Sequence, residues 1–330
     1  MYSLEFEGIN SFLIGTSRLL LEEGVKRDVR NSVCYELPEP YMFKIKNPCA
    51  RHITIPQRSW FKTLAYAESL WIASGRNDMA YITHYLPRMK DYSDDGRTMR
   101  GGYGPRLRHF NGSIADYDVS EYRMSNYGET DQFRYVCDCF REDANTRRAI
   151  ITIGDPVKDC FESNGELKHT KDIPCTRTLH FMKDNNSDKL NLIVSMRSND
   201  FIYGASGVNI FNYTFMQEYF ASMLGLEVGY YIHIANNIHY YDLHSRLVSS
   251  LASLSDVEDE GTPYNTTFRS LEQFDNLLSQ LVFQETMMRL SWNDYKPYQF
   301  EDAFFDNWYS VLYRYNPKIR KQSQWQSQLQ

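Results

Sequence analysis

The chain has 330 residues, a formal net charge of −6 and six cysteines. This length allows one large domain or two smaller ones, and the mild negative charge gives no indication of a nucleic-acid-binding surface. No apolar run approaches the roughly 20 residues of a membrane-spanning helix, and the first residues lack the basic and apolar segments of a signal peptide. We therefore expect a cytoplasmic protein with reduced cysteines and no membrane contact.

The spacing of apolar residues in the first third of the chain predicts helices and strands around one embedded acid. The predicted elements are helices over 11–24 and 59–75, a charged turn over 26–31, and strands over 41–45 and 52–55. Glu68 lies among the apolar residues of the second helix. There it either faces solvent or, if it is buried, requires a partner or a raised pKa.

The middle of the chain combines loops with short elements. These are a glycine-rich loop over 91–108, a helix over 131–142, a strand over 149–153, a polar surface loop over 155–172 and a strand over 178–182. The Gly-Gly-Tyr-Gly run of the first loop lacks the glycine spacing of a nucleotide-phosphate loop. Cys137 and Cys139 form a lone Cys-x-Cys pair, which is a weak indication of a metal site. Cys175 follows a proline at a strand start, where a cysteine is most often a small buried residue.

The segment over 191–244 has the most informative pattern. An apolar strand over 192–196 ends in the polar run Arg-Ser-Asn-Asp at 197–200, and apolar residues at helical spacing then predict a buried helix over 208–224. This order is typical of a frame for a polar ligand, although a turn around a salt-bridged arginine gives the same pattern.

A further strand is predicted over 230–234, and it leads to His239, Tyr241 and His244. These three side chains lack an acidic or thiol ligand at the spacing of a metal site. Beyond them, the composition predicts an acidic surface loop over 256–261, a long amphipathic helix over 271–290 and a polar, frayed tail over 321–330.

Five motifs follow one another along the chain. They are Ala67-Glu68-x-Leu70-Trp71-x-x-x-Gly75, Thr146-Arg147-Arg148, Pro174-Cys175, Arg197-Ser198-x-Asp200-x-x-x-Gly204 with Asn209 beyond it, and His239-x-Tyr241-x-x-His244. Together they resemble the thymidylate synthase and pyrimidine hydroxymethylase family over roughly residues 19–244. The resemblance implies an α+β catalytic domain over 1–244, with a twisted mixed β-sheet flanked by helices. Residues 245–330 would form a C-terminal helical extension packed on the same domain.

The resemblance also implies a reaction, since members of this family transfer a one-carbon unit from methylenetetrahydrofolate to C5 of a pyrimidine nucleotide. Cys175 would add to C6 as a thiolate and thereby make C5 reactive. Glu68 would organise water and proton transfers, and Tyr103 matches a tyrosine close to the reacting base. Asp200 and Gly204 would face the folate. No metal is implied.

The implied substrate is a deoxyuridylate-like nucleoside monophosphate, held by residues from two subunits of a homodimer. The implied contacts are Arg30, Arg147, Arg148 and Arg197 at the phosphate, Ser198 on the nucleotide, Asn209 at the base, and His239 and Tyr241 at the ribose 3′-hydroxyl. Guanidinium groups suit phosphate oxygens, and a carboxamide can pair with N3 and O4 of uracil. The pair Arg147 and Arg148 would reach the phosphate of the partner subunit.

Five features depart from the family pattern. Thr176 and Ala67 replace histidines that are common beside the nucleophile and the catalytic glutamate, and Asn209 lies one residue further from Gly204 than in the bacterial synthases. Residues 86–103 contain no tryptophan, and the chain ends in glutamine-rich sequence where methylating enzymes have an apolar tail. A wetter site favours water over hydride, so we expect hydroxymethylation rather than methylation. A family member that binds nucleotide without catalysis is the alternative from another functional class.

Overall fold

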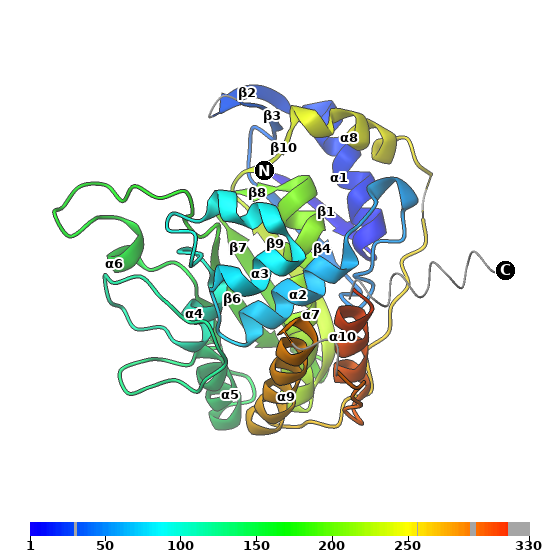
Figure 1. Ribbon diagram of the computed structural model, residues 1–330. Helices are drawn as coiled ribbons and strands as arrows, with labels where there is room; N and C mark the ends of the chain where they lie inside the picture. Colours follow the sequence, from blue (N-terminus) through cyan, green and yellow to red (C-terminus); the bar gives the residue numbers. More distant parts are fainter. Residues whose placement is uncertain (30–31, 256, 291–294, 316–330) are drawn as a thin grey trace, which may run out of the picture.

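A computed structural model describes residues 1–29, 32–255, 257–290 and 295–315 (Figure 1). Its centre is a six-stranded sheet in the order β1-β4-β9-β7-β6-β5. The strands are β1 (Tyr2–Phe6), β4 (Tyr41–Ile45), β9 (Glu227–Ala235), β7 (Lys189–Met196), β6 (Thr176–Lys183) and β5 (Ile150–Thr152). The pairs β1–β4 and β7–β9 are parallel and the other neighbours are antiparallel, so the sheet is mixed. The predicted α+β class, with a mixed sheet flanked by helices, is confirmed.

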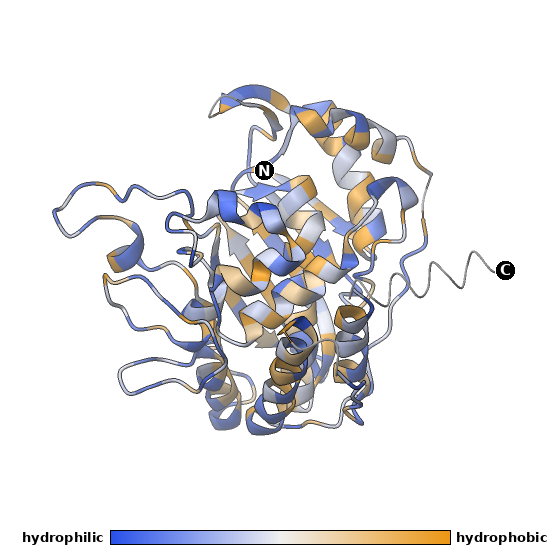
Figure 2. Cartoon of the chain, in the orientation of Figure 1, coloured by the Kyte–Doolittle hydropathy of each residue, from blue (hydrophilic) through white to orange (hydrophobic). Residues whose placement is uncertain are grey.

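Helix α7 (Ile210–Leu224) lies along β7 and β9 at the centre of the helical layer. Helices α2 (Lys62–Ala73), α5 (Gln132–Glu142) and α9 (Leu271–Leu290) pack against α7 in turn. Almost every residue of α7 is buried, which explains why its sequence is apolar around the whole circumference and not along one stripe. In Figure 2 the hydrophobic residues gather where these helices meet the sheet, and the outlying loops are mostly hydrophilic.

A second, four-stranded sheet closes one end of the large one (Figure 1). Its strands are β2 (Val25–Val29), β3 (Ser32–Glu36), β10 (Ile238–Tyr241) and β8 (Asn199–Asp200). Beside it, α1 (Ile9–Glu23) packs on α8 (Ser245–Ala252). The parallel pairing of β8 with β10 aligns His239 with Asp200, so two motifs about forty residues apart become neighbours.

The remaining helices are short except for α10, which is the last helix in the described part of the chain. They are α3 (Met79–Tyr85), α4 (Tyr103–Arg108), α6 (Pro156–Asp159) and α10 (Ala303–Arg314), with short turns η1 (Pro56–Arg58), η2 (Pro87–Tyr92) and η4 (Asp242–His244) and a π-helix, η3 (Phe201–Asn209). None of the helices in the described ranges is long and apolar enough to cross a membrane.

Helices α9 and α10 pack on the layer that contains α2. The indole N–H of Trp308, on α10, donates to the Tyr66 carbonyl of α2 at 2.8 Å. The Arg108 guanidinium forms two hydrogen bonds, of 2.9 and 2.8 Å, with the Asp275 carboxylate of α9. The residues after 244 therefore help to build the layer that holds Glu68. The division of the chain at residue 244 stays a prediction.

Most predicted elements appear within a few residues of their expected bounds, and the helix over 271–290 has the expected bounds. Two predictions are wrong. Residues 52–55 form no strand, because the His52 ring packs between α2 and α7 and bonds to the Tyr66 hydroxyl at 2.9 Å. Residues 26–29 form part of β2 and not a turn, and their charged side chains suit an exposed edge strand.

Other predictions were incomplete or lie outside the described ranges. The glycine-rich loop over 91–108 contains α4, and the loop over 155–172 contains α6. Arg30 and the tail over 321–330 lie outside the described residues.

Trp308→Ala is expected to lower the free energy of unfolding by about 3–5 kcal/mol, because it removes a fully buried indole and leaves a cavity between α10 and α2. Urea denaturation measures the change. Phe283→Ala, at an exposed position on α9, is the control and should change the midpoint little. Equal midpoints for the two variants would contradict the packing of α10 on α2.

Candidate active site

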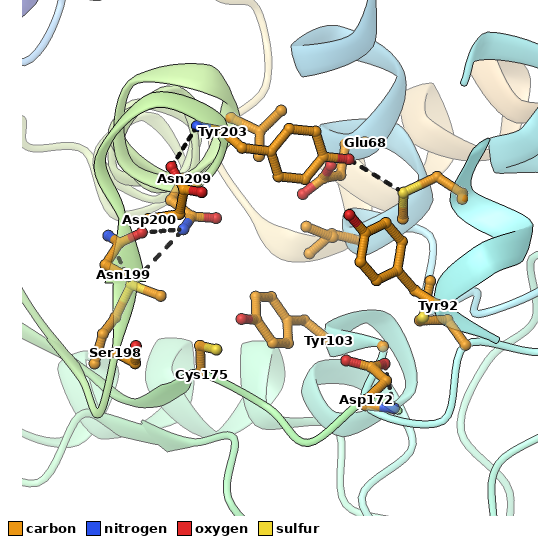
Figure 3. A pocket seen from close by; sticks show the side chains of 18 of the residues that line it. Glu68, Tyr92, Tyr103, Asp172, Cys175, Ser198, Asn199, Asp200, Tyr203 and Asn209 are labelled. Carbon is orange, nitrogen blue, oxygen red and sulfur yellow. Dashed lines mark hydrogen bonds between the residues drawn. The ribbon is translucent and has the colours of Figure 1, made fainter. Parts of the chain in front are cut away.

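A cavity of about 250 Å³ opens where β6, β7 and β8 end, facing α2 and η3 (Figure 3). Seven of the residues singled out from the sequence line it: Glu68, Tyr103, Cys175, Ser198, Asp200, Gly204 and Asn209. They come from segments more than 140 residues apart, so the fold and not local sequence brings them together.

Cys175 reaches the cavity through the pairing of β6 with β7. Strand β6 begins at Thr176, which pairs with Met196 at the end of β7, so Cys175 lies beside Arg197. The Arg197 amide donates to the Cys175 carbonyl at 2.9 Å. The Arg197 guanidinium donates to the carbonyls of Pro174 and Ile173 at 3.1 and 2.8 Å. Arg197 is exposed, and its two hydrogen bonds stabilise the loop that carries the thiol. Its guanidinium group has further N–H donors that an anion could accept from.

The segment that leads from Gly204 to Asn209 lies within a π-helix. Residues Phe201–Asn209 form η3, and its last turn has the i→i−5 bond from the Ile210 amide to the Ala205 carbonyl. A π-helix accommodates one extra residue per turn, and such bulges are frequent at functional sites. Asn209, at the end of η3, lines the cavity and is 8% exposed, and the expected extra residue before it stays a prediction.

A buried chain of hydrogen bonds orients the Asn209 amide. Asn209 Nδ2 donates to Asn199 Oδ1 at 3.1 Å, and Asn199 Nδ2 donates to His233 Nε2 at 3.1 Å. Burial lowers the pKa of His233 to about 3, so the ring is neutral and its Nδ1 proton faces the Tyr231 hydroxyl at 2.7 Å. Gly204 packs against the amide pair, since a Cβ there would lie 2.5 Å from Asn199 Oδ1.

Glu68 enters the cavity from α2. Burial raises its pKa to about 7, and a 3.0 Å hydrogen bond from Asn212 Nδ2 opposes this shift. Asn212 is held in turn by the Ser69 hydroxyl, which donates to its Oδ1 at 2.7 Å. The sequence left two possibilities for Glu68, a side chain in solvent or one held in the protein with a partner and a raised pKa. The structure supports the second. A carboxyl group with this pKa can both donate and accept a proton near neutral pH.

Tyr103 lines the cavity next to Cys175, and Thr176 is bonded to it from beneath. The Thr176 amide donates to the Tyr103 hydroxyl oxygen at 3.3 Å, and the Thr176 hydroxyl contacts that of Tyr213. Burial raises the pKa of Tyr103, so its hydroxyl group stays protonated. The threonine that replaces a common family histidine is fully buried beneath the site and does not line the cavity.

Several cavity residues were missed from the sequence. Asp172 lies three positions before Cys175, in the segment read as a surface loop, and Trp71 lines the cavity from α2. Asn199 was treated only as the variable position of its motif. Tyr92 and Tyr203 carry no motif signal. The one available signal was the short separation of Asp172 from the proposed nucleophile.

Five of the predicted residues that the structure describes lie away from the cavity lining: Arg147, Arg148, Arg197, His239 and Tyr241. Arg147 and Arg148 are exposed, and Arg148 forms a 2.8 Å ion pair with Glu142. His239 and Tyr241 lie on β10, with the two rings edge to face at 5.4 Å. His239 Nδ1 is 2.7 Å from the Asn237 amide oxygen, and burial lowers the pKa of His239. No cluster of three or more His, Cys, Asp or Glu side chains suited to a metal occurs in the part of the chain that the structure describes.

Comparison with known proteins adds a family match. A family model described as thymidylate synthase matches residues 17–323. A deoxyuridylate hydroxymethyltransferase of Pseudomonas phage M6 is 31% identical over 288 residues, which cover 86% of this chain and 74% of the relative. One of Bacillus phage SP01 is 36% identical over 202 residues, covering 61% and 49%. A thymidylate synthase of Mycoplasma genitalium is 29% identical over 119 residues, covering 36% and 38%.

Proposed function

The chain belongs to the thymidylate synthase family, as its motifs predicted, and we propose from this premise that it transfers a one-carbon unit from methylenetetrahydrofolate to C5 of a deoxyuridylate-like nucleotide. The observation that carries the proposal is the cavity that joins Cys175, Glu68 and Asn209. These side chains supply a nucleophile, a proton-transfer group and an amide that can read a base. The chain spans about three quarters of the Pseudomonas phage relative and about half of the Bacillus phage relative, so the proposal rests first on the site and only then on the names of relatives.

Cys175 starts the proposed reaction. Its thiolate adds to C6 of uracil, the electrons of the C5–C6 double bond move toward O4, and C5 becomes nucleophilic. Glu68 faces the same cavity and, with a pKa of about 7, exchanges protons with O4 and with ordered water. Tyr103 remains a neutral hydrogen-bond donor beside the sulfur-bearing loop.

The wall between η2 and η3 fits the flat ring system of a folate. The Tyr203 hydroxyl contacts Met89 Sδ at 3.3 Å, and the Arg88 guanidinium lies 4.9 Å from the centre of the Tyr203 ring. Asp200 Oδ1 accepts the amides of Ile202 and Tyr203, both at 2.8 Å, and among the described residues its Oδ2 accepts no hydrogen bond. A carboxylate oxygen placed there suits the N–H groups of a pterin. When bound, methylenetetrahydrofolate supplies the carbon that is joined to C5.

A homodimer would complete the phosphate site. Arg147 and Arg148 do not line the cavity of their own chain, so their proposed contact requires a second one. The sheet face opposite α7 presents partly exposed apolar side chains, including Ile193, Ile232 and Ile234. His180 lies on the same face of the sheet, since it pairs with Ile193 on the neighbouring strand. It bonds to the Arg147 carbonyl at 3.2 Å, so the loop that carries the arginines borders this face. A partner docked on the sheet would therefore meet the arginines.

Two features favour hydroxymethylation over reductive methylation. The relatives from Pseudomonas phage M6 and Bacillus phage SP01 are named for hydroxymethyl transfer, and residues 87–92 contribute Met89 and Tyr92 to the cavity where methylating enzymes have tryptophan. Thymidylate synthesis and nucleotide binding without catalysis are the competing functions. The cytoplasmic location inferred from the cysteines stays a prediction.

Turnover with labelled deoxyuridylate and methylenetetrahydrofolate tests this proposal. We expect release of the C5 hydrogen to water and a hydroxymethylated nucleotide by mass, without dihydrofolate absorbance. Cys175→Ala should abolish release, because no enolate forms, whereas Cys160→Ala, at an exposed cysteine, should not change it. Dihydrofolate formed in step with a methylated product would identify a thymidylate synthase. Wild-type protein that releases nothing would be a nucleotide-binding protein.

Base choice is expected to depend on Asn209. An amide can accept from N3–H and donate to O4 of uracil, whereas cytosine offers the reverse pattern. Asn209→Asp should shift the ratio of kcat/KM toward cytidylate by about five- to a hundredfold, since an unpaired buried polar group costs roughly 1–3 kcal/mol. Efficient turnover of cytidylate by the wild-type enzyme would mean that another group reads the base.

Subunit sharing predicts complementation between two inactive chains. An equal mixture of Cys175→Ala with Arg147→Ala/Arg148→Ala chains should recover about one quarter of wild-type activity, because half of the dimers are mixed and each has one intact site of two. Subunit exchange is verified by a mass tag on one chain. Exchange without recovered activity would show that the arginines do not act across the interface.

A further inference from the structure

Asp172 adds a third carboxyl group to the cavity, besides those of Glu68 and Asp200. It lines the same cavity as Cys175 and Tyr103. In Figure 3 the Tyr103 ring is drawn between Cys175 and Asp172, and Asp172 lies across the cavity from Asn209 and Glu68. The proposed steps at C6 and O4 do not involve this carboxyl group.

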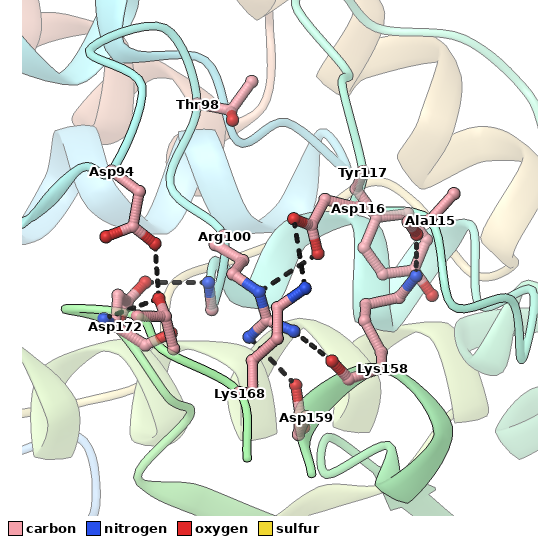
Figure 4. A network of polar contacts seen from close by, with 12 residues as sticks. Asp94, Thr98, Arg100, Ala115, Asp116, Tyr117, Lys158, Asp159, Lys168 and Asp172 are labelled. Atoms are coloured by element: carbon pink, nitrogen blue, oxygen red, sulfur yellow. Dashed lines mark hydrogen bonds and ion pairs between the residues drawn. The ribbon is translucent and has the colours of Figure 1, made fainter. Parts of the chain in front are cut away.

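The position of Asp172 is fixed by the loops behind it (Figure 4). Its Oδ2 accepts the Gly101 amide at 2.8 Å, and a Cβ at position 101 would lie 2.7–2.9 Å from the carboxyl atoms. The neighbouring Arg100 is buried and pairs with Asp116 at 3.1 Å and Asp159 at 3.5 Å, which anchors the Gly101 backbone. Gly101 thus leaves room for the carboxyl group because it has no side chain, and its amide orients that group.

The carboxyl group remains available for a further hydrogen bond. Its Oδ1 accepts none from the described residues. Burial raises the pKa of Asp172, while the Gly101 amide, Arg106 and Arg100 oppose the shift and Asp94 adds to it. A carboxylate of raised pKa is a stronger base than an exposed one.

Pyrimidine geometry places Asp172 near the reacting carbon. In the pyrimidine ring the N3–C4 edge is opposite the N1–C6 edge, and C5 lies between C4 and C6. A base whose N3 and O4 face Asn209 therefore turns C6 toward the opposite wall, where Cys175 lies (Figure 3). C5 then lies at the side between these two walls, and the group attached to it points into the part of the cavity that Tyr103 and Asp172 border.

We propose that Asp172 is the general base for the water that completes the hydroxymethyl group. This inference rests on the proposed function. After tetrahydrofolate leaves, an exocyclic methylene remains on C5. Water oxygen bonds to that carbon, and one water proton moves to the Asp172 carboxylate. The electron pair of the exocyclic double bond moves toward O4. The resulting enolate re-forms C5=C6 and expels the Cys175 thiolate, so charge and atoms balance.

Two carboxyl groups on opposite walls then have separate tasks. Glu68, bonded to Asn212 beside the base-reading amide, serves O4 and the early proton transfers. Asp172 serves the last addition. Differences in environment commonly divide acid and base roles between two carboxyl groups in this way.

The experiment separates the early steps from the last one. Asp172→Asn retains the size of the side chain and an acceptor for the Gly101 amide but cannot take a proton. We expect C5 hydrogen release in a single turnover to stay within about threefold of wild type. Hydroxymethyl nucleotide per hydrogen released should fall by at least about a hundredfold, the lower range for general base catalysis. Added mercaptoethanol, whose thiolate needs no base, should trap the methylene as a thioether.

Asp94→Asn is the matched control. Asp94 holds the same loop through the Thr170 hydroxyl and the Lys171 amide, outside the cavity, so its product ratio should equal that of wild type. An unchanged ratio in Asp172→Asn, or loss of hydrogen release in proportion to product, would overturn the role of Asp172. If Asp172→Asn does not fold, Asp172→Ala decides: formate should restore hydroxymethyl formation, and no restoration rejects the proposal. Wild-type enzyme that makes no hydroxymethyl nucleotide would instead refute the proposed function.

Discussion

The register of β6, β7 and β9, in the inner part of the large sheet, determines where three of the five motifs lie. Thr176 pairs with Met196, and Met196 pairs with Ala235, so three strands from distant parts of the sequence end in line. The thiol loop, the Arg-Ser-Asn-Asp run and the segment leading to β10 therefore leave the sheet side by side. A slip of one residue would turn the buried side chains of β7 to the opposite face and separate Cys175 from Arg197. The alternation of buried and partly exposed residues along β7 and β9 makes such a slip costly.

Polar groups within the core extend this control to the cavity. Asn199, His233 and Tyr231 are buried, yet each has a hydrogen-bond partner. In a low-dielectric interior an unpaired member would be costly, so the chain of bonds is cooperative and the amide of Asn209 has one preferred orientation. The π-helix contributes by placing Asn209 at the end of that chain of hydrogen bonds.

Motif order predicted the family and seven cavity residues, and apolar spacing predicted most of the elements. Other features depend on information that local patterns do not carry. Asp172 was assigned to a surface loop because its neighbours are polar, and its burial arises from Gly101, about seventy residues earlier. His233 follows the inward alternation of β9 and looks like any core position until Asn199 is placed beside it. The arginine pair lies away from the cavity of its own chain, which agrees with the proposed contact across a homodimer but does not test it.

The bond between Trp308 and the Tyr66 carbonyl has a consequence for the order of assembly. Tyr66 lies two residues before Glu68, and the helix that holds this turn from behind is among the last described segments of the chain. A nascent chain that has emerged only as far as His244 contains every motif but lacks α9 and α10. Its α2 would expose the apolar side that these helices cover. Completion of the catalytic layer must therefore follow synthesis of almost the whole polypeptide, and such distant contacts are formed slowly in folding.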